Sequence, residues 1–340
     1  MLKLIIKKLL RTAFLLTGIL LITFLLVHAI PGNPWSNYSS ATRMLQNISS
    51  DPVQQKELSL RFGLNLPIWR QFTRFLIGDF NPEGTFFCGA LCGNLGPSIQ
   101  QQGRTVQSII FDAPENKTFK ESRFGYSIRL FSLGALLAIG AGLALGMYLS
   151  ASPHSPLSDF INFGLSALIS IPNFVLGLLT IIVLASWLRI MKVLPDWNQP
   201  TSWIIPALVL AIIPMAGLAR VTRSSLMNLM HEDYIRTARA KGLSLRRVIL
   251  THLLRSALAP ILSSLGPALM ELFTGLLVIE TLYGFPGMAR DYWGAVLDLD
   301  YPMILGLTLI YAIGMLLINL LIELVSEALD PRLRSKHSTG

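Results

Sequence analysis

RVTRSSLMNLMHEDYIRTARAKGLSLRRVILTHLLRS, residues 220–256, is a polar island between two hydrophobic stretches of the chain. Eight of its residues are Lys or Arg. Positive charge close to the end of a membrane span is retained on the cytoplasmic side, so this island is expected to face the cytosol. A short helix within it would then be available to dock on a soluble partner.

The island itself predicts a short helix that stops abruptly. Asp233 lies where the N-terminus of a helix favours negative charge, and Arg239 and Lys241 lie in the last turn. Gly242 follows, and glycine readily takes the positive φ that ends many helices. Because Ser244 can cap a second helix, the expected shape is helix, glycine turn, helix.

The composition places the chain in a lipid bilayer. Hydrophobic residues make up 52% of it, charged residues 14%, and the mean hydropathy is +0.55, which is too apolar for an ordinary soluble domain. A hydrocarbon core about 30 Å thick needs roughly 20 apolar helical residues. We therefore expect an all-α membrane protein with about six transmembrane helices. Their expected positions are 9–30, 126–150, 160–187, 202–220, 257–283 and 302–326.

These spans predict the organisation of the chain. Residues 1–30 form a cytosolic tip and the first transmembrane helix, and residues 31–125 form an extracytoplasmic segment. Residues 126–326 form a core of five transmembrane helices that contains the island, and residues 327–340 form a cytosolic tail.

The net charge of +9 is explained by this orientation. With both termini in the cytosol, the basic residues before the first span, in the island and after the last span all lie inside. The short external loops carry only Arg189, Lys192 and Arg290. Nucleic acid is therefore not needed as a partner. The expected location is a prokaryotic plasma (inner) membrane, crossed several times and in contact with membrane lipid.

Both cysteines of the chain, Cys88 and Cys92, fall in the extracytoplasmic segment. An oxidising exterior permits a disulfide between them, with a modest effect on stability because the closed loop is small. A metal site is disfavoured, because it normally needs about four ligands and no His lies near the pair. In the same segment, the run 68–77 gathers apolar side chains on one side of a helix. That pattern fits a helix on the membrane surface or one packed on neighbouring spans.

Part of the island resembles a known motif. DYIRTARAKGL at 233–243 is similar to the cytoplasmic EAA loop of ABC-importer permeases, in the form used by the oligopeptide, dipeptide and nickel branch. The wider superfamily motif begins Glu-Ala-Ala, whereas this chain has Arg236-Thr237-Ala238, which fits the peptide branch better than the sugar or amino-acid branches. Further resemblances follow in that family's order over nearly the whole chain: HAIPGNP at 28–34, RFGLNLPIWRQF at 61–72, GNLGPS at 93–98, SIPNF at 170–174 and VIETLYGFPG at 278–287.

The resemblance implies a permease subunit with a fold like that of type I ABC importers. In that family the first helix of the island is the coupling helix, seated in a groove of the cytosolic ATPase. The implied partners are a homologous second permease, two ABC ATPases and an extracytoplasmic solute-binding protein. The alternative is a basic loop that merely lies on anionic lipid. The matching coupling residues are Asp233, Tyr234, Arg236, Ala238, Arg239, Lys241 and Gly242.

Catalytic motifs are missing from the sequence. It has no G-x-x-x-x-G-K-[ST] phosphate loop, so no cofactor is expected in this chain and the partner ATPases would bind ATP and Mg. H-E-x-x-H and G-x-S-x-G are missing as well. We therefore expect a transport subunit rather than an enzyme.

Polar residues within the spans mark a candidate translocation path, because ionisable groups in a bilayer are costly and usually functional. Glu271 lies well inside the fifth expected span, where it could attract a peptide ammonium, pair with Arg129 or pair with the partner permease. Asn173 could line the path or make an interhelical hydrogen bond. An outer gate or a structural turn is expected at Glu280, Pro286 and Gly287.

The favoured function is ATP-driven import of peptides, with this chain forming half of the translocation path. Oligopeptides are favoured over dipeptides, nickel chelates, glutathione and oligosaccharides. A secondary transporter would predict internal inverted repeats, and the sequence shows no convincing repeat. A membrane enzyme would need a nucleophile or metal constellation, and the sequence shows neither.

Overall fold

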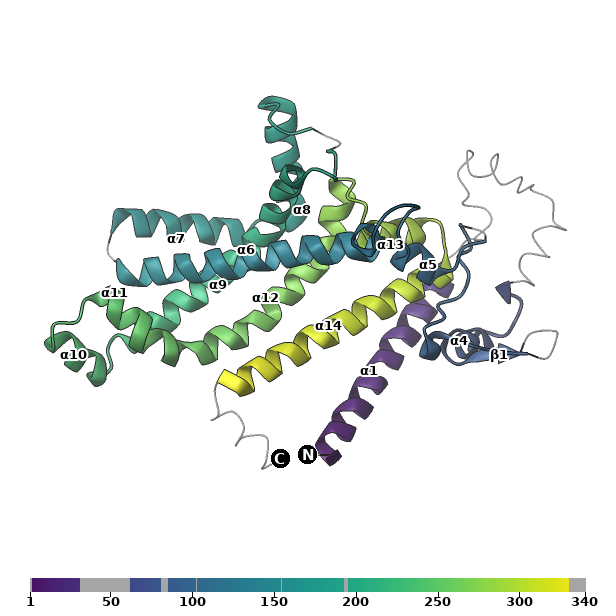
Figure 1. The fold of residues 1–340 in the computed structure, drawn as a ribbon, viewed down its shortest axis with the longest axis horizontal. Coiled ribbons are helices and arrows are strands. Elements are labelled where there is room, and N and C mark those ends of the chain that lie inside the picture. The colour runs from purple at the N-terminus through teal and green to yellow at the C-terminus, as the bar shows by residue number, and fades with distance from the viewer. Residues whose placement is uncertain are drawn as a thin grey trace. The chain divides into compact units, whose positions relative to one another are not determined.

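The computed structural model describes residues 2–30, 62–80, 85–101, 103–153, 155–192 and 195–329, without the side chains of 2–12, 239, 246, 250, 252 and 327–329. The described chain is mainly helical (Figure 1). It divides into two units. The first unit comprises Met1–Tyr126 and Gly287–Gly314. The second unit comprises Ser127–Pro286 and Met315–Gly340. The stretch Gly287–Gly314 thus groups with the residues before the expected core.

The first unit contains helices and one short hairpin. Its elements are α1 (Leu2–Ala29), α4 (Ile68–Leu76), β1 (Gly78–Phe80), β2 (Phe86–Cys88), η1 (Ala90–Cys92), α5 (Val106–Phe111), η2 (Phe119–Glu121), α13 (Met288–Leu297) and the first part of α14 (Tyr301–Leu329). The strands pair antiparallel, with Gly78 opposite Cys88. The sequence did not predict this hairpin, because strands of three residues are too short to show a readable alternation.

One buried carboxylate ties the start of α14 to the loop before α5. Asp300 is 2% exposed, and its Oδ1 accepts a hydrogen bond from Met303 N at 3.2 Å, which caps the helix. Its Oδ2 accepts hydrogen bonds from Ser98 Oγ and from Gln100 N. Burial raises the pKa of Asp300, and these hydrogen bonds oppose the rise.

An ion pair ties α13 to the first residue of α6 (Arg123–Ala151). Arg123 Nε lies 3.2 Å from Asp291 Oδ2, and both side chains are partly buried. Burial raises the pKa of the Asp291 carboxyl, while the positive charges of Arg123, Arg290 and Arg104 lower it. Three basic residues therefore oppose the effect of burial on this one acid.

Helix α4 packs on α1 along only part of its surface. The rings of Phe72 and Phe24 have centroids 5.4 Å apart, and His28 Nε2 lies 3.1 Å from Gln71 Oε1. Trp69 is 69% exposed. Packing on a neighbouring helix, one of the two placements expected for this segment, is therefore seen at Phe72. Trp69 does not take part in it and remains exposed.

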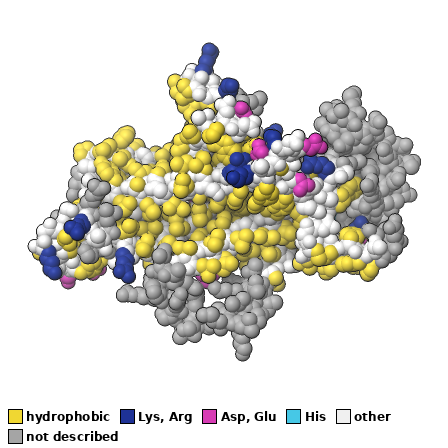
Figure 2. Space-filling view, viewed as in Figure 1, with side chains coloured by type: hydrophobic (Ala, Val, Ile, Leu, Met, Phe, Trp, Pro, Cys, Tyr) yellow, Lys and Arg dark blue, Asp and Glu magenta, His cyan; other side chains and the backbone are white. Residues whose placement is uncertain are grey.

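The second unit holds most of the long apolar helices. Its elements are most of α6, α7 (Pro156–Ile169), α8 (Asn173–Ile181), the π turn η3 (Ile182–Trp187), η4 (Pro200–Trp203), α9 (Ile204–Leu229), α10 (Asp233–Ala240), α11 (Leu245–Val248), the π turn η5 (Ile249–Leu253), α12 (Leu254–Leu282) and the rest of α14. Figure 2 shows hydrophobic side chains spread widely over the visible faces of these helices. Such surfaces are suited to lipid rather than to water.

Two glycines allow α6 to approach α9 closely. A Cβ atom on Gly142 would lie 2.9 Å from Met215 O, and one on Gly146 would lie 2.7 Å from Ala219 O. Small residues four positions apart are a common packing device between membrane helices, where hydrophobicity alone does not hold helices together. Close contact between α6 and α9 therefore depends on glycine, which has no side chain, at positions 142 and 146.

Within the described ranges, four helices are long and apolar enough to cross a membrane: Arg123–Ala151, Pro200–Leu229, Leu254–Leu282 and Tyr301–Ser326. They confirm four of the expected helical spans. The helix expected at 202–220 is longer than predicted, because no Gly or Pro follows in the first part of the island and Arg is a good helix former. The first ten residues of the island, 220–229, are therefore helix rather than loop.

The span expected at 160–187 is not one continuous helix. It consists of Pro156–Ile169 and Asn173–Trp187, which lie at 104° to each other. Pro172 lies at the break with φ −59° and ψ 143°, outside the helical region. Proline has no N–H to donate and disfavours a helical conformation in the residue before it. The break therefore falls on the SIPNF stretch.

The first expected span is helical, because α1 covers Leu2–Ala29. Its described side chains give an apolar helix over Ala13–Ala29, which alone is shorter than a typical crossing. Crossing by α1 stays a prediction. The tail 327–340 and residues 31–61 of the extracytoplasmic segment lie outside the residues whose side chains are described.

We expect Asp300→Ala to destabilise the first unit by about 1–3 kcal/mol, because the change removes a helix cap and leaves buried donors without an acceptor. Hydrogen exchange of detergent-purified protein should show faster exchange at the Gln100 and Met303 amides. Glu115→Ala, at an exposed carboxylate in the same unit, is the control and should leave both amides unchanged. Unchanged exchange in Asp300→Ala would contradict the assigned role of this carboxylate.

Candidate functional site

The expected coupling helix is present as α10, which begins at Asp233 and ends at Ala240. Gly242 follows with a φ of +84°, a conformation that residues with a Cβ atom rarely adopt. As α11 begins, the Ser244 carbonyl accepts a hydrogen bond from Val248 N at 3.0 Å. The helix, glycine turn and second helix are thus confirmed as structure, and their role in coupling stays a prediction.

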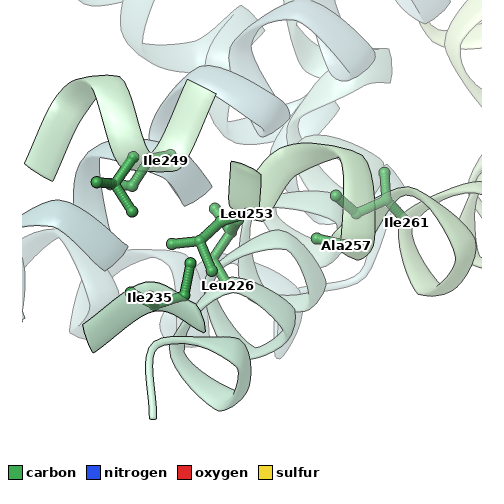
Figure 3. Close-up of a cluster of buried hydrophobic side chains, with 7 residues drawn as sticks. Leu226, Ile235, Ile249, Leu253, Ala257 and Ile261 are labelled. Carbon is green, nitrogen blue, oxygen red and sulfur yellow. The ribbon is translucent and has the colours of Figure 1, made fainter. Parts of the chain in front are cut away.

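One side chain anchors α10 to the rest of the second unit. Ile235 is 2% exposed, and Ala238, one turn later, packs partly buried on the same side. Full burial of a side chain such as Ile235 contributes about 1.5–3 kcal/mol. The other members of this anchor cluster come from α9, α11, η5 and α12 (Figure 3): Leu226, Val248, Ile249, Leu253, Ala257 and Ile261.

The rest of the α10 surface is exposed and charged. Arg236 Nη1 lies 3.7 Å from Asp233 Oδ1, but both side chains are so exposed that this ion pair contributes little stability. Tyr234 is 45% exposed, and Lys241 is exposed as well. Lys and Arg side chains are visible in Figure 2 at the end of the unit where Figure 1 places α10. Of the matching residues, Ala238 therefore packs inward, and these four are available to a partner. The Arg239 side chain lies outside the described residues.

Asn173 and Glu271, predicted separately as path residues, line one cavity. It lies at the break between α7 and α8 and has a volume of about 370 Å³. Asn173 is the first residue of α8, whereas Glu271 lies on α12. The other lining residues come from the break and from α9: Ile169, Ser170, Ile171, Pro172, Ile213 and Gly217.

Arg129 was an alternative partner for Glu271. Its guanidinium carbon instead lies 4.5 Å from the centre of the Trp203 ring, an arrangement that fits a cation–π interaction. Among the described residues no ion pair joins Arg129 to Glu271. The structure therefore leaves the carboxylate of Glu271 beside the cavity rather than beside this arginine.

The expected outer-gate stretch forms a tight turn after α12. Glu280 is fully buried, and its carbonyl accepts a hydrogen bond from Phe285 N at 2.8 Å. The Phe285 ring contacts Trp197 and Trp203, with centroid distances of 4.6 and 4.8 Å. After Pro286, Gly287 is the N-cap of α13. The turn is therefore held by aromatic packing, and its role as a gate stays a prediction.

The two cysteines are joined. Cys88 at the end of β2 and Cys92 at the end of η1 form a disulfide, with Cα atoms 5.8 Å apart. The sequence alone did not decide whether this disulfide forms.

Residues 138–335 match the family described as binding-protein-dependent transport system inner membrane component. The chain belongs to this family. A dipeptide transport system permease protein of Bacillus subtilis is 32% identical over 97% of each chain. An oligopeptide transport system permease protein of Haemophilus influenzae is 30% identical over 98% of this chain and 100% of its own. A solved methionine ABC transporter in inward-facing conformations gives a TM-score of 0.48 at 16% identity, over 60% of this chain and 93% of that one.

As an inner membrane component of this family, the chain is a membrane protein with several apolar helices. The part that matches the family contains α10, the cavity and the turn after α12, whereas the cysteine pair precedes it. The candidate site therefore lies within the family's shared region.

Sequence reasoning did not single out three residues of the site. Ile235 is the one large aliphatic residue of a polar helix, which was a readable signal for burial. Ser170 lies in the matched SIPNF stretch but carried no role there. Gly217 gave no signal, because glycine is common in transmembrane helices and only its neighbours in space show that it borders a cavity.

We expect Ile235→Ala to loosen α10, because it removes most of the buried side chain that holds the helix. Such a change costs about 2 kcal/mol or more, so the α10 amides should exchange hydrogen about 30-fold faster or more. Tyr234→Ala, at the neighbouring exposed position, is the matched control and should not change the exchange rates. If both variants exchanged like the parent protein, Ile235 would not be the anchor.

Proposed function

We propose that this chain is one of two permease subunits in an ATP-driven importer of peptides, whose ATP is hydrolysed by separate subunits. The relatives' names support peptides as the substrate class, since both a dipeptide and an oligopeptide permease match nearly the whole chain at about 30% identity. Oligopeptides and dipeptides both fit. The observation that carries the proposal is α10, anchored on one side by Ile235 and exposed on the other.

In the proposed mechanism, the ATPase binds the exposed residues of α10, and closure of the ATPase displaces this helix. The displacement passes through Ile235 to Leu226 on α9 and to Ala257 and Ile261 on α12. Packed interiors transmit such shifts because they have few voids to absorb them. Since α9 and α12 both contribute to the cavity, movement of α10 would reach the walls of the proposed path.

The other subunits are assigned from a motif missing in this chain and from the family resemblance. Its sequence has no phosphate loop, so ATP and Mg are assigned to two partner ATPases. A homologous permease would complete the path, and an extracytoplasmic solute-binding protein would deliver the substrate. Both termini and α10 are assigned to the cytosol, and the cysteine pair is assigned to the outside.

We expect Gly242→Val to abolish most stimulation of ATP hydrolysis by liganded binding protein. A Cβ atom at Gly242 meets nothing within 4 Å, so the effect would come from the φ of +84°, which β-branched residues tolerate poorly. Gly242→Asn should keep most of the stimulation, because Asn adopts this conformation more readily. Gly140→Val, where a Cβ is also uncrowded, is a second control. Full stimulation and uptake in Gly242→Val, measured in reconstituted vesicles, would rule out the coupling role.

The orientation can be tested by labelling with a membrane-impermeant maleimide. After mild reduction, Cys88 and Cys92 should react when the reagent is added outside, whereas Ser244→Cys in a variant lacking both native cysteines should not. Ser244 is exposed, so protection from the reagent would reflect its side of the membrane. In inside-out vesicles the same position should label readily. Labelling of position 244 from the outside of intact cells would overturn the orientation.

A further inference from the structure

We propose that the cavity at the α7–α8 break binds a protonated amino group, which in the importer proposed above is the amino terminus of the peptide. The inference rests on that proposed function only for the identity of the ligand. The chemistry of the cavity comes from its own residues.

Two side chains that line this cavity carry an acceptor without a donor. Glu271 forms no ion pair or side-chain hydrogen bond with another described residue. Asn173 Oδ1 is shielded from solvent and has no hydrogen-bond partner. A shielded acceptor without a donor costs about 1–3 kcal/mol. An ammonium group in the cavity supplies what Glu271 lacks, namely N–H donors and a positive charge.

The backbone at the break does not decide whether the cavity favours cations or anions, so Glu271 decides it. Helix α7 ends beside the cavity at Ile169, with Ser170 as its C-cap, and α8 begins there at Asn173. The C-terminus of one helix and the N-terminus of the next carry partial charges of opposite sign and similar size, about half an elementary charge each. They largely offset each other, so the carboxylate decides that the cavity favours cations.

One basic side chain on these helices, Arg220, is directed elsewhere. Arg220 follows Gly217 by three residues on α9, and its Nη2 donates a hydrogen bond to Ser166 Oγ on α7 at 3.1 Å. Ser166 precedes Ser170 by one turn. Among the described residues, Arg220 forms no ion pair with Glu271. Arg220 therefore joins α7 to α9 and leaves Glu271 for a ligand.

Gly217, in the wall of the cavity, and Gly275, beside Asn173, both affect the room available there. A Cβ atom on Gly217 would meet nothing within 4 Å, so the missing side chain keeps this wall of the cavity open. One turn after Glu271, a Cβ atom on Gly275 would lie 3.5 Å from Asn173 Nδ2, so the amide packs beside the bare backbone of α12. The volume of about 370 Å³ lies within the range of small-ligand pockets. It can hold an amino group together with the first residue of a peptide.

Charged thiol reagents test the cation preference without requiring transport. In the assembled complex with Cys88 and Cys92 replaced by Ser, Ser170→Cys is treated with aminoethyl and with sulfonatoethyl methanethiosulfonate. The rate ratio of cationic to anionic reagent should fall about tenfold in Glu271→Gln, because a cleft lined by one charge concentrates the opposite charge. Glu232→Gln makes the same chemical change in the exposed loop and should leave the ratio unchanged. An unchanged ratio in Glu271→Gln would overturn the site.

Filling the cavity gives a second, steric test. Gly217→Val should slow both reagents at Ser170→Cys, because its side chain would occupy the open space. Gly164→Val is the matched control, since a Cβ atom there also meets nothing within 4 Å but Gly164 does not line the cavity. Equal labelling in the two valine variants would contradict the proposed position of the ligand.

Uptake by reconstituted vesicles separates the site from the proposed function. With trialanine as the probe, Glu271→Gln should reduce ATP-driven uptake, and Glu271→Asp should restore part of it. If the parent complex imported trialanine while Glu271→Gln changed neither uptake nor the reagent ratio, the site would fail and the function would stand. If the reagent ratio fell as expected but ATP drove import of neither trialanine nor dialanine, the function would fail and the cation site would stand.

Discussion

The burial of Ile235 is the contact on which the coupling argument depends. Helix α10 has only eight residues, which is too short for an isolated helix to be stable in water. Its order must therefore come from tertiary packing, and the anchor cluster supplies that packing at the ends of α9 and α12. Within lipid, apolar contact between helices gives little net driving force. The hydrophobic effect acts fully only where the alternative to packing is exposure to water, as it is for a loop outside the bilayer. The burial of Ile235 can therefore stabilise α10 beside the ends of α9 and α12.

Local signals predicted the elements that depend on local physics. Apolar length predicted the four long helices, and the charge of Asp233 followed by Gly242 predicted the start and end of α10. Pro172 also carried a readable signal, but the continuous hydrophobicity on both sides of it suggested a single span. Because a proline restricts both itself and its predecessor, the 104° bend at the SIPNF stretch could have been anticipated.

Contacts between distant segments could not be predicted in the same way. Nothing in the sequence around Asp300 indicates that Ser98 would meet it, and nothing around Glu271 indicates that Asn173 would line the same cavity. These meetings are set by how helices approach one another. That approach depends on glycines such as Gly142, whose effect is visible only when the opposing backbone is known. The sequence therefore indicated Asn173 and Glu271 only as separate candidates, and the structure places both at one cavity.

The positions of the prolines connect the anchor cluster to the cavity. Pro214 lies three residues before Gly217 on α9, and Pro267 lies four residues before Glu271 on α12. A proline inside a helix removes one hydrogen bond and favours bending at that point. Both helices that carry the anchor cluster are therefore weakened within about one turn of the cavity. In the proposed mechanism, a displacement of α10 would bend α9 and α12 there rather than move them as rigid rods. The cavity walls, including Glu271, would then be one place where each helix bends.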